Sequence, residues 1–221
     1  METIARERTL WIKGLEGIGK TFLAYASFQK IRSQEDGRAS VAYFSFKEDF
    51  PYLQSVQNAF ACAALQVAES NTRYAEQVAN KLKDDGGKSK DISTGRRLFL
   101  SPFAIASQSS SGTTVPNDQL YLVFDGLDEA REQEREAFLH FLEELKKEKS
   151  RVHILVTSRT GEAELSEELE PLVIEATKQK MLHDMRTLIS TRLNTLSRLE
   201  KFSPLAKRVI RKKVSGRADG G

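Results

Sequence analysis

The sequence contains Gly14-Leu15-Glu16-Gly17-Ile18-Gly19-Lys20-Thr21, which matches the phosphate-binding pattern G-x-x-x-x-G-K-[ST] at every constrained position. A β-branched and aromatic run, residues 9–12, comes directly before it. After it, residues 22–31 carry apolar side chains at helical spacing. Because the pattern requires a strand, a loop and a helix in this order, the segment predicts a nucleotide-binding loop.

The chemistry of phosphate binding explains these residue types. Glycines such as Gly17 and Gly19 let the backbone curl so that successive N–H groups point inward, and all eight residues are candidate nucleotide contacts. A helix that begins at about Lys20 adds unpaired N–H groups and the positive end of its dipole. We expect Lys20 to reach the β- and γ-phosphates and the Thr21 hydroxyl to bind Mg²⁺.

A second block begins with the apolar run 120–124 and continues as Asp125-Gly126-Leu127-Asp128-Glu129-Ala130. An unbroken apolar run is typical of a strand buried on both faces of a parallel sheet, and ligands bind at the carboxyl ends of such strands. Asp125 is therefore predicted to hold Mg²⁺ through water, and Asp128 or Glu129 to orient or deprotonate the attacking water. Alternatively, these acids form the N-cap and first turn of the helix that follows.

A third block, residues 152–157, reads as another buried strand, and it ends in Ser158 and Arg159. An arginine at this edge of the sheet can make bidentate contacts with a γ-phosphate, which disappear once that phosphate is released. The alternative is a surface ion pair between Arg159 and the acidic run 162–170.

The remaining chain alternates strands, helices and polar loops. Two further strands are predicted, at 39–46 and 171–175. Further helices are predicted at 49–67, 71–83, 181–193 and 203–217, the last of them basic. The segments 84–91 and 107–117 are polar or low in complexity, and they predict surface loops.

Composition indicates a globular α/β protein of one medium domain with a small annex. The chain has 221 residues, a net charge of +3 and a single cysteine, Cys62, which excludes an internal disulfide. No apolar run is long enough to span a bilayer, and the mixed charges of residues 1–8 exclude a secretory signal. We therefore expect a cytoplasmic protein without a membrane partner.

The three blocks, 14–21, 125–130 and 157–159, together resemble a NACHT domain, from the STAND class of P-loop NTPases. Within this class, the fungal incompatibility-type proteins resemble the sequence more closely than the animal innate-immune NLR proteins do. The resemblance implies a parallel five-stranded P-loop sheet of order 5-1-4-3-2 flanked by helices, with a C-terminal helical annex. It divides the chain into a core, 1–176, and a helical extension, 177–221.

The resemblance also assigns roles to individual residues. Lys20 and Thr21 fall on the nucleotide and magnesium positions, and Asp125 falls on the metal-linked carboxylate. Asp128 and Glu129 fall on the acidic pair of hydrolysis. Arg159 falls on the first sensor. The resemblance implies a continuation into a winged-helix domain and sensing repeats, neither of which we expect within this sequence, and no effector domain is expected before Leu10.

We therefore expect the nucleotide-binding core of a larger switch protein, as a natural short form or a fragment. Its ligands would be ATP or GTP with Mg²⁺, with ADP or GDP in the resting state, and hydrolysis would be slow because rapid turnover would defeat a switch. Effector and sensor domains are expected outside the chain, and homo-oligomer formation on activation stays open. Two alternatives remain: another P-loop enzyme, such as a DNA-dependent ATPase or a small-molecule kinase, or a scaffold that does not hydrolyse nucleotide. Nucleic acid is not the expected partner.

Overall fold

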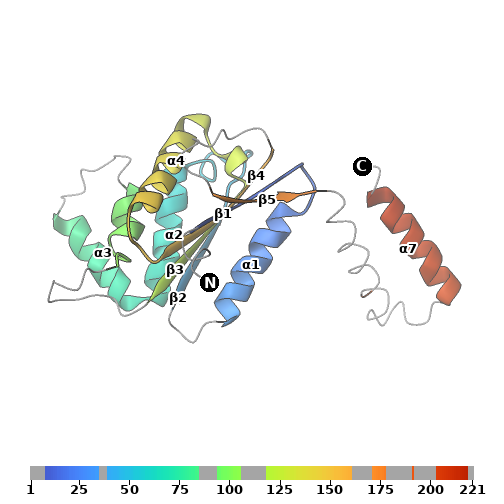
Figure 1. Ribbon diagram of the computed structural model, residues 1–221, viewed down its shortest axis with the longest axis horizontal. Helices are drawn as coiled ribbons and strands as arrows, with labels where there is room; N and C mark the ends of the chain where they lie inside the picture. Colours follow the sequence, from blue (N-terminus) through green and yellow to red (C-terminus); the bar gives the residue numbers. More distant parts are fainter. Residues whose placement is uncertain are drawn as a thin grey trace. The chain divides into compact units, whose positions relative to one another are not determined.

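Five strands form one sheet in the computed structural model of the chain (Figure 1). They are β1 (Thr9–Gly14), β2 (Ala39–Ser45), β3 (Gln119–Asp125), β4 (Val152–Ser158) and β5 (Leu172–Ala176). Their spatial order is β2-β3-β4-β1-β5, and the described pairings of β1 with β4, β2 with β3, and β3 with β4 are all parallel. Read from the β5 edge, this is the predicted order 5-1-4-3-2, and the predicted parallel P-loop sheet is confirmed.

The structure describes residues 8–34, 39–84, 94–105, 118–160, 171–177, 191 and 203–218. The chain divides into two compact units. The first contains Met1–Lys13 and Lys20–Ile174, and the second contains Gly14–Gly19 and Glu175–Gly221. The second unit includes helix α7 (Pro204–Ala218), which agrees with the predicted basic helix. The predicted helix 181–193 lies outside the described residues, apart from Thr191.

Strand register brings the carboxyl ends of β2, β3 and β4 to one level. Ser45 is the Cα partner of Asp125, and Phe124 is the partner of Val156. Because the pairing is parallel, Thr157 follows Val156 at the level of Asp125. These last residues of the strands therefore lie in a row at the edge of the sheet where open α/β folds bind their ligands.

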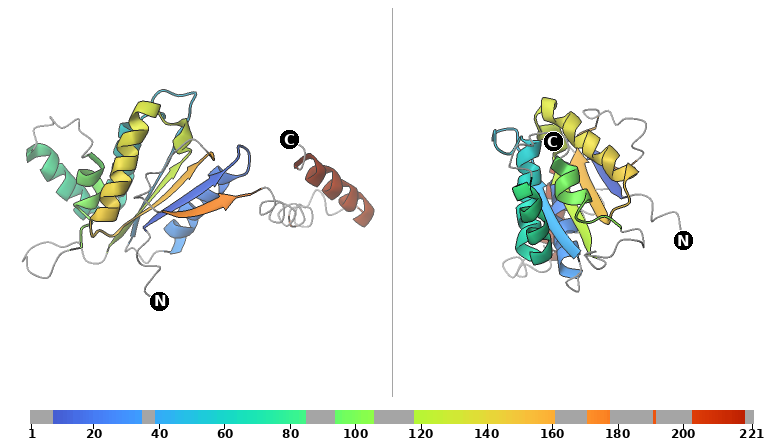
Figure 2. Two further views of the ribbon diagram at one scale, coloured as in Figure 1. Left: turned by 45° about the horizontal axis from the view of Figure 1, so that its top comes forward. Right: turned by 90° about the vertical axis from the view of Figure 1, so that its left-hand side faces the viewer.

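Helices cover both faces of this sheet (Figures 1 and 2). Helix α1 (Lys20–Gln34) packs on one face, against β2, β3 and β4. On the other face lie α2 (Val56–Ser70), α4 (Glu132–Lys147) and a short π-helix, η2 (Arg96–Leu100), while α3 (Thr72–Asp84) packs against α2. None of the helices in the described part of the chain combines the length and apolar character needed to cross a bilayer.

The main core lies between the sheet and the α2 and α4 helices. Phe60 of α2 is 3% exposed and contacts four other rings, at centroid distances of 5.1–6.0 Å. These rings belong to Phe99, Phe124, Phe138 and Phe141. The apolar stripe that the sequence predicts for α4 is buried here, as is the stripe of α2. Burial of both stripes fixes α2 and α4 against the sheet.

Two features differ from the sequence prediction. Helix α2 begins at Val56 rather than near Asp49, because Ser55 is its N-cap and accepts a hydrogen bond from the Asn58 N–H. The π-helix η2 was not predicted, although Phe99 and Leu100 are fully buried in the core. Its five residues are too short to show a helical period.

Candidate functional site

The glycine loop has the backbone that the pattern predicts. Gly17 and Gly19 adopt positive φ angles of 72° and 91°, in the region that L side chains rarely enter. At Gly14, a Cβ atom would come within 2.9 Å of the Ala176 carbonyl oxygen, so this position has no room for a side chain. Gly14–Gly19 belong to the second unit.

Lys20 and Thr21 form the first turn of α1, as predicted. The amino end of a helix carries unpaired N–H groups and a partial positive charge. Thr21 is exposed, so its hydroxyl can reach a ligand. Because α1 packs on β2, β3 and β4 and follows the end of β1 after a short loop, Thr21 lies towards the carboxyl edge of the sheet.

Asp125, the last residue of β3, is 1% exposed and is held by hydroxyl groups on both sides. The Thr157 hydroxyl donates to its Oδ1 at 2.6 Å, and the Ser45 hydroxyl donates to its Oδ2 at 3.0 Å. The Tyr43 hydroxyl lies 3.4 Å from the same Oδ2. Burial, followed by the negative charge of Asp125, raises the pKa of Tyr43 to about 12, so this phenol stays protonated and can donate.

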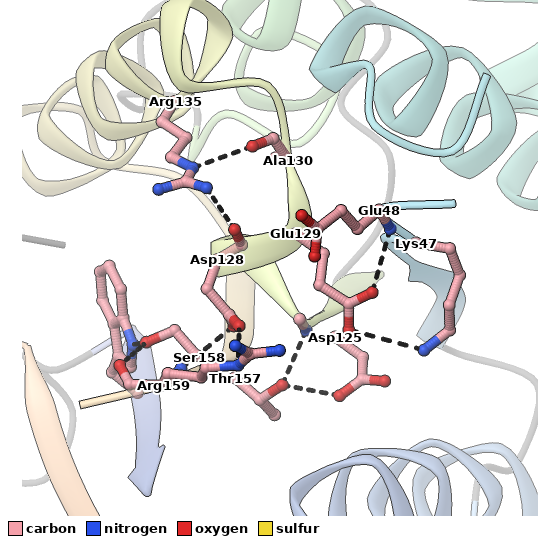
Figure 3. A network of polar contacts seen from close by, with 12 residues as sticks. Lys47, Glu48, Asp125, Asp128, Glu129, Ala130, Arg135, Thr157, Ser158 and Arg159 are labelled. Atoms are coloured by element: carbon pink, nitrogen blue, oxygen red, sulfur yellow. Dashed lines mark hydrogen bonds and ion pairs between the residues drawn. The ribbon is translucent and has the colours of Figure 1, made fainter. Parts of the chain in front are cut away.

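Asp128 and Arg159 form an ion pair (Figure 3). The Arg159 backbone N–H donates to Oδ1 of Asp128 at 3.0 Å, and Nε of Arg159 lies 3.0 Å from Oδ2. The Asp128 side chain is 5% exposed and that of Arg159 is 38% exposed. Both oxygens of Asp128 are therefore engaged by one arginine.

Two structural alternatives were open for these residues: an N-cap role for the acids, and an ion pair between Arg159 and an acidic run. The N-cap of α4 is Arg131, not Asp128, which instead lies in a 3-10 helix, η3 (Leu127–Glu129). Arg135 closes that short helix by donating to the carbonyl oxygens of Asp128 and Ala130. The acidic run 162–170, offered as a partner for Arg159, lies outside the described residues.

Glu129 is the more accessible of the two acids, with a side chain that is 25% exposed. Its Oε2 accepts a hydrogen bond from the Glu48 N–H at 3.1 Å, and its Oε1 lies 3.7 Å from the Lys47 ammonium (Figure 3). Gly126 has a φ of 76°, and a Cβ atom there would lie 3.3 Å from Glu129 Oε1. Because Gly126 has no side chain, the Glu129 carboxylate can lie beside Lys47 and Glu48, which follow β2.

Hydrogen bonds and an ion pair join the start of α4 to the start of α2. Oε2 of Glu134 accepts the Ser55 hydroxyl at 2.8 Å and the Val56 N–H at 2.8 Å. Oε1 of Glu134 pairs with Arg131 at 3.1 Å, and the Arg131 N–H donates to the Gln54 carbonyl oxygen. Burial opposes ionisation of Glu134, but these hydrogen bonds outweigh it and lower its pKa. The segment after Asp125 is therefore tied to the segment after β2.

The structure adds residues that the sequence interpretation did not assign. Thr157, Ser45 and Tyr43 contact Asp125, and their common signal is a polar group near the end of an otherwise apolar strand. Ser158, next to Arg159, accepts a hydrogen bond at 2.8 Å from the indole of Trp11, which is fully buried on β1. The end of β4 is thus anchored to β1 as well as to β3.

The residues present fit a magnesium ion bound largely through water. Within the described residues, no three His, Cys, Asp or Glu side chains gather into a metal site. Mg²⁺ commonly keeps several waters and takes only one or two protein ligands besides phosphate oxygens. The exposed residue Thr21 and an oriented Asp125 carboxylate, whose Oδ1 keeps an unused lone pair, suit that arrangement.

Comparisons with known proteins identify the family to which the sequence is similar. Residues 2–159 match the family model described as Nephrocystin 3, N-terminal. Among curated proteins, none matches the chain.

Solved structures to which the chain shows similarity include a chain of Drosophila ORC bound to DNA, with 13% identity and a TM-score of 0.49 over 96% of this chain and 49% of that one. A chain of the E. coli MS115-1 HORMA:CdnC:Trip13 complex has 14% identity and a TM-score of 0.45 over 94% of this chain and 58% of that one. Cdc6p from Pyrobaculum aerophilum has 11% identity and a TM-score of 0.42 over 80% and 41%. The chain thus spans about half the length of these structures.

Proposed function

Because the chain belongs to the Nephrocystin 3, N-terminal family, we propose that it is a magnesium-dependent switch module that binds ATP or GTP and hydrolyses it slowly. The family confirms the NACHT-type P-loop core predicted from the sequence. A P-loop nucleotide-binding domain is therefore the premise, and the signalling role is the proposal. The observation that carries it is the row of functional groups at the carboxyl edge of the sheet, beside the amino end of α1.

Nucleotide would be held by the loop Gly14–Gly19 and by Lys20. Backbone N–H groups and the helix dipole suit the phosphate chain, and the Lys20 ammonium adds a point charge. Thr21 and Asp125 would hold Mg²⁺, the latter through water. When bound, the ion would neutralise charge on the phosphate oxygens.

Asp128, Glu129 and Arg159 would have different roles in hydrolysis. Glu129 suits the water-orienting role better than Asp128, because it is more exposed and its contact with Lys47 is a long one. Asp128 would hold Arg159 until a γ-phosphate competes for the guanidinium. Since both acids start in intramolecular contacts that must loosen, slow turnover is expected, below the roughly 10 per second of a median enzyme.

The wider context is part of the proposal. The core, 1–176, would carry the nucleotide site, and the helical extension, 177–221, would lead towards domains outside this chain. Effector and sensor domains, and other copies of the protein on activation, are the proposed partners, in the cytoplasm. Such partners would respond to the population of nucleotide states rather than to turnover.

A second candidate, a DNA-dependent ATPase, is favoured by one feature. Helix α7 has no acid between Pro204 and Ala218 and carries Lys207, Arg208, Arg211, Lys212, Lys213 and Arg217. Basic helices of this kind attract phosphate backbones. Stimulation of hydrolysis by duplex DNA, with an affinity that falls steeply with salt, would favour this candidate over the switch.

Thermal unfolding with Mg²⁺ and ADP, ATP or GTP tests the proposed function. At about one hundred times the dissociation constant, one site adds ~2.7 kcal/mol, or roughly 5 to 11 °C for a domain of this size. Lys20→Ala should abolish the shift, whereas Lys30→Ala, at an exposed lysine of the same helix, should retain it. No shift in the folded parent, or an equal shift in Lys20→Ala, would refute the proposal.

A further inference from the structure

The carboxylate of Asp125 is fixed from two neighbouring strands. Thr157 of β4 holds Oδ1 at 2.6 Å, while Ser45 of β2 holds Oδ2 at 3.0 Å. Without partners, a carboxylate can rotate about its last side-chain bond and exchange its two oxygens. With a hydroxyl donor on each oxygen and almost no solvent exposure, this one has a single orientation. Oδ2 also accepts from the Tyr43 hydroxyl at 3.4 Å, whereas Oδ1 has Thr157 as its one hydroxyl donor and keeps a lone pair for a further donor.

The direction of the Thr157 hydrogen bond follows from its other partner. The Gly126 N–H donates to the Thr157 hydroxyl oxygen at 2.8 Å. A hydroxyl has one proton to give, and a backbone N–H can only donate. The Thr157 proton therefore points to Asp125 (Figure 3), and with the Gly126 N–H the three residues form a closed polar ring at the end of β3.

Burial keeps this arrangement dry. Thr157 is fully buried and Asp125 is 1% exposed, so water does not compete for the bond between them. Arg159, two residues beyond Thr157, pairs with Asp128 in the same region. The end of β4 therefore contacts both acids, one through a hydroxyl and the other through a guanidinium.

We propose that Thr157 and Ser45 are positioning residues that orient Asp125 towards magnesium-bound water, and so set how strongly nucleotide binding depends on Mg²⁺. The inference rests on the nucleotide-binding function proposed above. Neither residue is assigned a contact with nucleotide. Partners that orient metal-linked groups commonly change metal affinity by 10–100-fold when they are removed.

The test compares the dissociation constant of ADP, measured by calorimetry, with excess Mg²⁺ and with EDTA. Thr157→Val keeps the shape of the side chain and removes the hydroxyl. We expect it to reduce the magnesium-dependent gain in affinity about tenfold, while the constant measured in EDTA stays unchanged. Thr157→Ser should restore the parent value. Thr9→Val, at a buried threonine of β1, is the matched control and should behave as the parent.

Ser45 provides an independent arm, because it is only partly buried and its substitution does not threaten the core. Ser45→Ala should weaken the magnesium effect in the same direction. Ser40→Ala on the same strand should not, since the Ser40 hydroxyl contacts Asn71 instead. Two results would overturn the inference. In the first, Mg²⁺ strengthens ADP binding by the parent, and by Thr157→Val and Ser45→Ala to within twofold of the same extent. In the second, both variants weaken ADP binding in EDTA as much as they do in Mg²⁺. A parent that does not bind ADP at all would instead refute the proposed function.

Discussion

Substitution of Glu134 by glutamine tests the hydrogen bonds that join α4 to α2. Glu134 accepts two hydrogen bonds of 2.8 Å, from the Ser55 hydroxyl and from the Val56 N–H, at the amino end of α2. Glutamine has the same shape but carries no charge, and its amide nitrogen cannot accept. The change therefore removes the negative charge and one hydrogen-bond acceptor of Glu134 without creating a cavity.

The expected loss follows from these contacts. A hydrogen bond to a charged group contributes about 1.5–3 kcal/mol, and a negative charge at a helix amino end adds about 0.3–1 kcal/mol. Because the amide oxygen of glutamine retains part of the first contribution, we expect Glu134→Gln to lower the free energy of unfolding by about 2 kcal/mol at neutral pH. For a domain of this size, the midpoint of thermal unfolding should fall by roughly 4–8 °C.

The difference should also depend on pH. The pKa of Glu134 is lower in the folded than in the unfolded chain, so its contribution is complete above the unfolded pKa and is lost as pH falls through the folded pKa. Urea unfolding of parent and variant between pH 7 and pH 3 measures this directly. Glu132→Gln removes the same charge from an exposed residue of the same helical turn, so it should lose only the helix-end contribution of about 0.3–1 kcal/mol. A difference below 0.5 kcal/mol, or one that is constant with pH, would refute the reasoning.

Three further outcomes are expected. Phe60→Ala should lower the free energy of unfolding by about 3–5 kcal/mol in urea, because it empties the centre of the ring cluster; a loss under 1 kcal/mol would contradict the packing. Gly126→Ala should cost about 1–2 kcal/mol because φ is 76°, and unchanged thermal stability would argue against that backbone. Burial and the charge of Arg8 lower the pKa of His153, so the parent should lose stability as pH falls through the ordinary histidine range. Melting curves of His153→Gln should lack this loss; an identical pH profile in parent and variant would count against it.

The sheet could be predicted because its strands have strong local signals. The apolar runs 120–124 and 152–156 lack alternation, as strands covered on both faces must, and the glycine pattern defines the loop between β1 and α1. The order of the strands came from the family resemblance, since nothing in single runs of residues specifies their neighbours. The boundary at residue 176 stays a prediction.

The partners of the site residues could not be predicted, because they depend on contacts distant in sequence. Arg159 lies directly before an acidic run, yet the described ion pair is with Asp128, 31 positions earlier. Ser55 carries a recognisable N-cap signal, but the carboxylate that joins it comes from α4, 79 positions later. Types of residue at strand ends predicted a polar site, and only the register of the strands determined which hydroxyl meets which acid. The roles of these residues in catalysis stay predictions.

The indole of Trp11 gives the protein an internal optical reporter. Trp11 is the single tryptophan of the sequence, and its N–H is bonded to the Ser158 hydroxyl, one residue before Arg159. Selective excitation of this fluorophore therefore reports from one defined position beneath the arginine. Any movement of the β4 end that breaks the indole hydrogen bond should shift the emission of an unlabelled, unmodified chain.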